Sequence, residues 1–253
     1  MDSYGPLCTL FYDLDKPQAP PAAFEYYLAR AREAGGRVLE PMCGSGRFLL
    51  PLLRAGVDIE GFDASLAMLA ACRRHADRQN LHPVLYHQFM EQLDLPHRFR
   101  MAFIPSGSIG LLSSDQSLQL GLVQVRRHLE PGSSLLLEII SSSDEDVSDP
   151  AGERDIESRS VRVDDERTIV FRCKERPSDD PSVVYLSGRY EEMRGDEVIS
   201  SETESIRLRK HSAQQILALL DAAGYVHSRV LDGDELSWLR ESDCMLVQAR
   251  SKD

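Results

Sequence analysis

Two carboxylates and two glycines in the first quarter of the chain have the types and spacing that indicate ligand chemistry. Glu40 ends a short apolar run, Gly44 and Gly46 follow it, and Asp63 ends a second apolar run. Glycines in such a turn let the backbone approach a ligand, and a carboxylate about 20 residues further on is placed to accept hydrogen bonds from ribose hydroxyls. The pattern predicts a strand, a glycine turn, a helix and a second strand that together bind a nucleoside.

The charge of Glu40 narrows the choice of nucleoside. A dinucleotide fingerprint has a third glycine where this chain has Leu49, and it places pyrophosphate at the start of the helix. Glu40 would repel that dianion, whereas it would attract a ligand that carries a sulfonium and an ammonium and no phosphate. The residues therefore favour S-adenosylmethionine over NAD.

Two segments resemble the class I S-adenosylmethionine-dependent methyltransferase family, namely Val38–Phe48 and Gly61–Met68. The resemblance runs from about residue 12 to 140 and resumes over 209–225. It implies that Glu40 and the two glycines surround the methionine moiety and that Asp63 holds the ribose. The further cofactor-binding residues that it implies are Tyr12, Cys43, Ala64, Met68, Phe89, Met90 and Ile104, with Phe89 at a position where the family usually has an acid.

The acceptor side is expected near Ser106, in the segment Pro105–Gly110, which follows the fourth predicted strand. This segment lacks the aromatic and amide side chains with which nucleic-acid amino-methyltransferases hold a flipped base, and the net charge is −12. Both features argue against nucleic acid and favour a small-molecule substrate. Ser106 and His211 are the candidate catalytic residues. His87 is expected to be structural, and Glu138, inside an apolar strand, is expected to be either a structural ion-pair partner or a substrate ligand.

Alternating strand and helix patterns over residues 1–140 and 210–253 predict a doubly wound α/β sheet of seven strands, the last one antiparallel. Within it, a helix is expected from Gly46 to Ala55, and a turn at Pro131-Gly132 is expected before the fifth strand. Residues 141–209 interrupt it with strand-like runs, one of them broken near Asp164-Asp165, and with a turn at Arg194-Gly195-Asp196. These runs predict a small antiparallel β insertion that serves as a substrate cover or a dimer contact, so the protein is expected to be a monomer or a homodimer.

The leading functional hypothesis is methyl transfer to a small molecule, to nitrogen rather than oxygen because the insertion is acidic. Residues 141–205 contain 19 Asp and Glu against nine Lys and Arg. The alternative is an S-adenosylmethionine-binding protein without transfer activity, which Phe89 and the lack of a convincing base would explain. The five scattered cysteines indicate reduced thiols and no metal site, and no segment looks like a membrane span or a leader, so a cytoplasmic location is expected.

Overall fold

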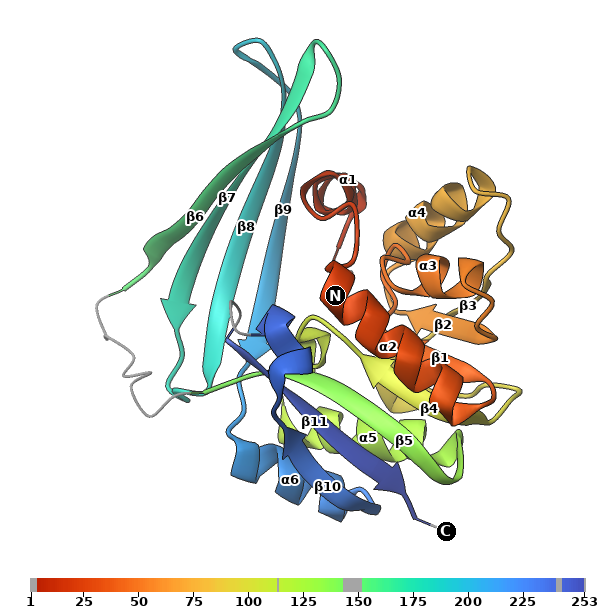
Figure 1. Ribbon diagram of the computed structural model, residues 1–253. Coiled ribbons are helices and arrows are strands. Elements are labelled where there is room, and N and C mark those ends of the chain that lie inside the picture. Colours follow the sequence, from red (N-terminus) through yellow and green to blue (C-terminus); the bar gives the residue numbers. More distant parts are fainter. Residues whose placement is uncertain (1–3, 113, 143–151, 240–242, 253) are drawn as a thin grey trace.

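A seven-stranded sheet forms the body of the computed structural model, which describes residues 4–112, 114–142, 152–239 and 243–252 (Figure 1). The strand order is β10-β11-β5-β4-β1-β2-β3, and β11 runs antiparallel to both of its neighbours. The strands are β1 (Val38–Pro41), β2 (Ile59–Asp63), β3 (Val84–His87), β4 (Phe99–Ile104), β5 (Leu129–Ile140), β10 (Tyr225–Leu231) and β11 (Cys244–Ser251). This confirms the predicted fold class.

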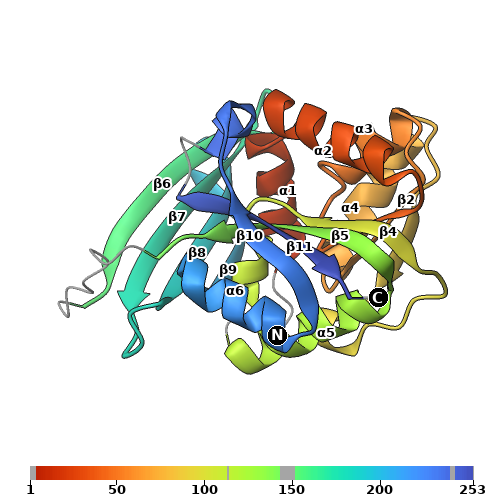
Figure 2. The ribbon, with the colours of Figure 1, turned by 60° about the horizontal axis from the view of Figure 1, so that its bottom comes forward.

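Helices cover both faces of this sheet (Figures 1 and 2). They are α2 (Pro21–Ala34), α3 (Leu49–Arg54), α4 (Leu66–Asp77), α5 (Asp115–Arg127) and α6 (Ala213–Ala222). Along β5, Leu135 and Leu137 pack in the cluster that contains α5 and α6, whereas Leu136 packs in the cluster that contains α2, α3 and α4. Successive side chains of a strand point to opposite faces, which explains why these apolar runs are continuous rather than alternating.

Two local expectations need correction. Helix α3 begins at Leu49 rather than at Gly46, so Pro51 lies in its first turn, where a missing amide hydrogen costs little. Strand β5 begins at Leu129, because the expected turn at Pro131-Gly132 is instead part of the strand. The pairing of β4 with β5 shifts register over this segment, and Gly132 has a φ of 71°. The segment is therefore an irregularity within β5 rather than a turn before it.

The second sheet is antiparallel, with the order β6-β7-β8-β9. Its strands are β6 (Arg154–Arg162), β7 (Arg167–Pro177), β8 (Val183–Arg194) and β9 (Glu197–Arg209). This confirms the antiparallel insertion and the break near Asp164-Asp165. Helix α1 (Pro6–Asp15) lies between this sheet and α4 (Figure 1). In the ranges that the structure describes, no helix is long and apolar enough to cross a bilayer.

Helix α1 and the second sheet share a hydrophobic cluster of their own. Phe171 stacks on Tyr190 at 4.7 Å between ring centroids, and Phe11 of α1 lies 5.1 Å from Phe171. The other buried members of this cluster are Leu7, Cys8, Ile169 and Cys173. The predicted division into a core (1–140 and 210–253) and an insertion (141–209) stays a prediction, and α1 packs with the insertion.

Candidate functional site

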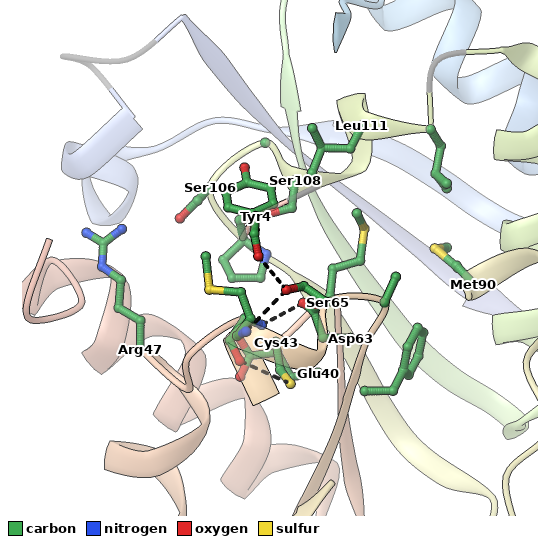
Figure 3. A pocket seen from close by; sticks show the side chains of 18 of the residues that line it. Tyr4, Glu40, Cys43, Arg47, Asp63, Ser65, Met90, Ser106, Ser108 and Leu111 are labelled. Carbon is green, nitrogen blue, oxygen red and sulfur yellow. Dashed lines mark hydrogen bonds between the residues drawn. The ribbon is translucent and has the colours of Figure 1, made fainter. Parts of the chain in front are cut away.

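A cavity of about 510 Å³ opens where β1, β2 and β4 end, beside α1. The chain leaves β1 toward β2 on one side and β4 lies on the other, so the cavity is at the switch point where open α/β sheets bind ligands. The predicted site residues that line it are Tyr12, Glu40, Cys43, Gly44, Asp63, Ala64, Met68, Phe89, Met90 and Ser106. In Figure 3, Glu40, Cys43 and Asp63 lie together, with Ser106 and Ser108 across from them.

Three predicted site residues are not among those that line the cavity. Gly46 packs the glycine turn onto α4, since a Cβ built there would lie 2.6 Å from the Cys72 sulfur. Ile104 is fully buried in the cluster beneath the site. His211 is 1% exposed and lies just after β9, where the chain turns into α6.

The side chain of His211 lies in a buried polar region beside the first turn of α5. Neither ring nitrogen has a hydrogen-bond partner among the described residues, and Nε2 lies 3.9 Å from an oxygen of Asp115. Burial, reinforced by the charge of Arg209, lowers the pKa of His211. The catalytic role suggested for His211 stays a prediction, and its ring would need a path to the cavity to fulfil it. His87 is satisfied as expected, with Nε2 2.9 Å from the Ala64 carbonyl oxygen.

The glycine turn and Asp63 hold each other in place. The amide of Gly44 donates to one oxygen of Asp63 at 2.8 Å, and the amide of Ser65 donates to the other at 2.8 Å. Gly44 has a φ of 54°, a conformation that favours glycine. Burial raises the pKa of Asp63 although these amides and that of Ala64 oppose the shift. The carboxylate is thus fixed at the end of β2 with its remaining lone pairs available to a ligand.

Glu40 carries a buried oxygen that has no partner. The residue is 2% exposed at the end of β1, and its Oε2 accepts no hydrogen bond among the described residues. Burial, with a further contribution from the charge of Asp63, raises the pKa of Glu40 well above its usual range. An unpaired buried carboxylate costs free energy that a cation would recover. The cavity therefore fits a ligand that brings a positive charge to β1.

Two cationic side chains also line the cavity. The Nε of Arg47 donates to the Gln18 carbonyl at 2.8 Å, and its guanidinium lies 5.9 Å from the Phe48 ring centroid. Lys16 lies over Tyr12, with its ammonium 5.7 Å from the ring centroid. Arg47 is half-buried, and within the described residues no ion pair joins it to Glu40. Lys16 was not predicted, because its contact with the cavity depends on the packing of α1.

The loop after β4 is held by Glu138 of β5. Ser106 has a φ of 60°, and its amide donates to Glu138 Oε2 at 2.6 Å. The other carboxylate oxygen accepts from the Tyr27 hydroxyl at 2.8 Å and from Trp238 Nε1 at 3.0 Å. Glu138 has structural partners as one expectation had it, but within the described residues they are hydrogen-bond donors rather than an ion-pair partner, and Glu138 is not among the residues that line the cavity.

Further lining residues escaped the sequence reasoning. Tyr4, Met42, Leu111, Ile140 and Leu208 belong to five different parts of the chain. Only Leu208 comes from the strands of the second sheet. Met42 has a φ of 57°, unusual for a residue other than glycine, in the turn after β1. Met42 could have been predicted as a site residue, since it lies between Glu40 and the glycines. The other four residues are brought to the cavity by the fold.

Comparisons with known proteins agree with this geometry. Residues 38–132 match the family model of a methyltransferase domain. Among curated proteins, the chain is 31% identical over 81 residues to a ubiquinone biosynthesis O-methyltransferase from Xanthomonas axonopodis pv. citri (strain 306). That alignment covers 30% of this chain and 34% of that protein, so the chain matches about a third of the length of such relatives.

The similarity to solved structures extends over nearly the whole chain. A sugar N-methyltransferase from Streptoalloteichus sp ATCC 53650 has a TM-score of 0.76 at 21% identity, covering 100% of this chain and 96% of that one. An S-adenosylmethionine-dependent methyltransferase from Clostridium acetobutylicum ATCC 824 has a TM-score of 0.73 at 17% identity, covering 96% and 97%. An S-adenosylmethionine-bound amino pentose methyltransferase from Micromonospora echinaspora has a TM-score of 0.67 at 19% identity, covering 91% and 90%.

The family model and these folds bear on different parts of the argument. The family model matches the segment with the strand, turn and helix that hold Glu40, Gly44 and Asp63. The similarity to the solved sugar N-methyltransferase extends over the whole chain, including the seven-stranded sheet and the insertion. Residues 38–132 match the model of a methyltransferase domain, and the chain has the fold of the S-adenosylmethionine-dependent methyltransferases to which it is similar.

Proposed function

We propose that the protein transfers a methyl group from S-adenosylmethionine to a nitrogen of a small molecule. The observation that carries the proposal is the unpartnered Oε2 of Glu40, buried at the wall of a cavity in a methyltransferase domain. Few common nucleoside ligands combine a positive charge with the absence of phosphate. S-adenosylmethionine does, because it carries a sulfonium and an ammonium.

The cavity offers a partner for each polar part of this cofactor. Glu40 would accept from the ammonium, and Asp63 from the ribose hydroxyls. Arg47 and Lys16 supply positive charge for the carboxylate. The adenine would take the apolar end, formed by Met68, Phe89 and Met90. Sequence reasoning gave neither cation a role toward the cofactor carboxylate, although with Glu40 they provide charges opposite to both charged groups of a zwitterionic amino acid.

The bound cofactor supplies a methyl group on a sulfonium that is already a good leaving group. The protein must then align the acceptor and exclude water. Ser106 and Ser108 border the space across from Glu40, and Tyr12 of α1 and Tyr4, which precedes that helix, also line it. A neutral amine brings its own lone pair and needs no general base, whereas a hydroxyl acceptor gains from one.

The preference for nitrogen has a different basis from the one that the composition suggested. Acidic residues of the insertion are engaged elsewhere: Glu202 accepts from the amide of Leu7 in α1, Glu204 accepts from the amide of Tyr4, and Glu191 pairs with Arg172 and Arg189. The proposal is supported instead by similar solved structures, a sugar N-methyltransferase and an amino pentose methyltransferase, whose similarity extends over 100% and 91% of this chain. The O-methyltransferase relative matches only 81 residues and keeps oxygen as a second candidate.

The decisive experiment measures binding first and transfer second. Calorimetry should detect the binding of S-adenosylmethionine. A panel of amino sugars and other amines, with matched hydroxyl analogues, is then incubated with the protein and the cofactor. We expect S-adenosylhomocysteine and a methylated amine by mass spectrometry. Methylation of the hydroxyl analogues alone would reassign the acceptor to oxygen. Binding without transfer to any acceptor would favour a cofactor-binding protein without transfer activity, and binding of NAD alone would overturn the proposal.

A further inference from the structure

Glu138 is a buried carboxylate that contacts the site only through another residue. It is 4% exposed, it lies in β5 on the side of the sheet covered by α2, and it accepts three hydrogen bonds. The three donors come from Tyr27 in α2, from Ser106 in the loop after β4, and from Trp238 in the segment Asp234–Leu239. Removing a carboxylate from water costs free energy, and several hydrogen-bond donors are needed to offset that cost.

The donor that matters for the site is the amide of Ser106. Ser106 and Gly107 both have left-handed φ values, 60° and 67°, so the chain turns sharply as it leaves β4. A conformation of this kind in a residue other than glycine persists only where the surroundings impose it. The hydrogen bond to Glu138 Oε2, at 2.6 Å, is the contact that fixes the Ser106 amide, and Ser106 and Ser108 then face the cavity.

A neutral isostere cannot reproduce this arrangement. Glutamine has one acceptor oxygen and one donor nitrogen in the place of two acceptors. With its oxygen toward Ser106, its nitrogen would face Trp238 Nε1, which is only a donor. With its oxygen toward Trp238 and Tyr27, its nitrogen would face the Ser106 amide, and the loop would have to move. In either orientation one buried donor faces another donor and has no acceptor.

We propose that Glu138 is a positioning residue for methyl transfer, which sets the place of the Ser106 loop and thereby of the acceptor. The proposal rests on the proposed function for its kinetic consequence, but not for the contact itself. Glu138 touches neither the cavity nor its ligand, so its removal should alter alignment much more than cofactor affinity. A displacement of about 1 Å at a reacting group lowers turnover by roughly 100-fold.

The test compares Glu138→Gln with Glu60→Gln. Glu60 is the control, because it is also a buried glutamate in a core strand, 3% exposed, and also accepts from a tyrosine hydroxyl, that of Tyr86 at 2.9 Å. Its Oε1 also lies 3.2 Å from Arg37 Nε and 2.9 Å from His97 Nδ1, so Glu60→Gln also reports the general cost of neutralising a buried glutamate. It does not line the cavity. Three quantities are measured for each variant: the dissociation constant of S-adenosylmethionine, kcat at saturating cofactor and acceptor, and hydrogen exchange of the peptide that contains Ser106.

For Glu138→Gln we expect faster exchange at Ser106, a kcat lowered by about 10- to 100-fold, and a cofactor dissociation constant close to that of the wild type. Glu60→Gln should leave exchange at Ser106 and kcat unchanged. Because Trp238 is the only tryptophan in the sequence, its emission also reports on Glu138, and it should shift in Glu138→Gln but not in Glu60→Gln.

The outcomes separate the two proposals. Unchanged exchange at Ser106 in Glu138→Gln would overturn the positioning role, whether or not the wild type transfers methyl groups. Equal losses of kcat in both variants would also overturn it, since general destabilisation would then be sufficient. If the wild type binds cofactor but methylates no acceptor, the proposed function fails, while faster exchange at Ser106 would still establish the contact.

Discussion

At the scale of single residues, the charge of Glu40 links cofactor binding to pH. Burial and the charge of Asp63 raise the pKa of Glu40 well above its usual range. A cationic ligand binds the ionised carboxylate, so the affinity for S-adenosylmethionine should rise as the pH increases toward and through this raised pKa, and binding should release a proton. Calorimetry at several pH values, in buffers of different ionisation enthalpy, measures both effects.

The neutral variant Glu40→Gln gives the control for this prediction. It should bind the cofactor less tightly by about 1.5–3 kcal/mol, the usual contribution of a hydrogen bond to a charged group. Cofactor binding to this variant should also no longer release a proton. If the affinity changes with pH in the same way in the wild type and in Glu40→Gln, the titrating group is not Glu40.

Asp63 carries a second prediction at this scale. Its carboxylate is fixed by the amides of Gly44 and Ser65 and is expected to accept from the ribose. Asp63→Ala should weaken S-adenosylmethionine binding by about 1.5–3 kcal/mol, because hydrogen bonds to a charged group are lost. Asp63→Asn should also weaken binding, because its nitrogen would face the amide of either Gly44 or Ser65 in place of an accepting oxygen. A dissociation constant that is unchanged in the alanine variant would show that Asp63 is not the ribose ligand.

At the scale of elements, helix α1 depends on the insertion for its start. Gly5, the residue before the helix, offers no side chain to cap it, and Glu202 of β9 accepts instead from the amides of Leu7 and Cys8 at 2.9 and 3.2 Å. A carboxylate at a helix N-terminus also complements the helix dipole. Because α1 carries Tyr12 and Lys16 toward the cavity, this cap belongs to the cover of the site.

Removing the cap should therefore loosen the cover. We expect Glu202→Ala to destabilise α1 by about 0.5–2 kcal/mol, as for other lost caps, with faster hydrogen exchange over residues 6–15 and weaker cofactor binding. Glu197→Ala is the matched control, because Glu197 is exposed at the start of the same strand. Equal exchange over residues 6–15 in the two variants would argue against the cap.

The elements also show where sequence reasoning succeeds. The turn between β1 and α3 was predictable because its glycines, Glu40 and Asp63 lie within 25 residues and each has a local physical reason. The contact of Glu138 with Ser106 was partly within reach: β4 and β5 are parallel neighbours with Ile104 opposite Leu137, so Glu138 had to lie beside the start of the loop. The contact of Glu202 with α1 could not be predicted, since it joins residues 195 positions apart.

At the scale of the whole molecule, the helix at the beginning of the chain joins two sheets that the sequence presents as separate. The composition of the insertion is that of a solvated acidic surface or of an environment suited to an amine substrate. The structure gives the sheet another connection to the site, because its apolar face packs against Leu7, Cys8 and Phe11 of α1. The resemblance assigned Tyr12 of this helix to the cofactor, but no local pattern marks Leu7, Cys8 and Phe11 as partners of strands that lie about 150 positions or more further along the chain.

This connection predicts that a residue far from the ligand affects its binding. Phe171 does not line the cavity, but it stacks on Tyr190 and contacts Phe11 of α1. Phe171→Ala should cost about 3–5 kcal/mol of stability, the range for deleting a buried aromatic side chain. Because α1 then loses support, added S-adenosylmethionine should raise the thermal midpoint of the variant by less than that of the wild type. Val198→Ala, at an exposed position of the same sheet, should change neither quantity. A variant whose second sheet melts alone, with the cofactor affinity of the wild type, would mean that α1 holds the cavity without the insertion.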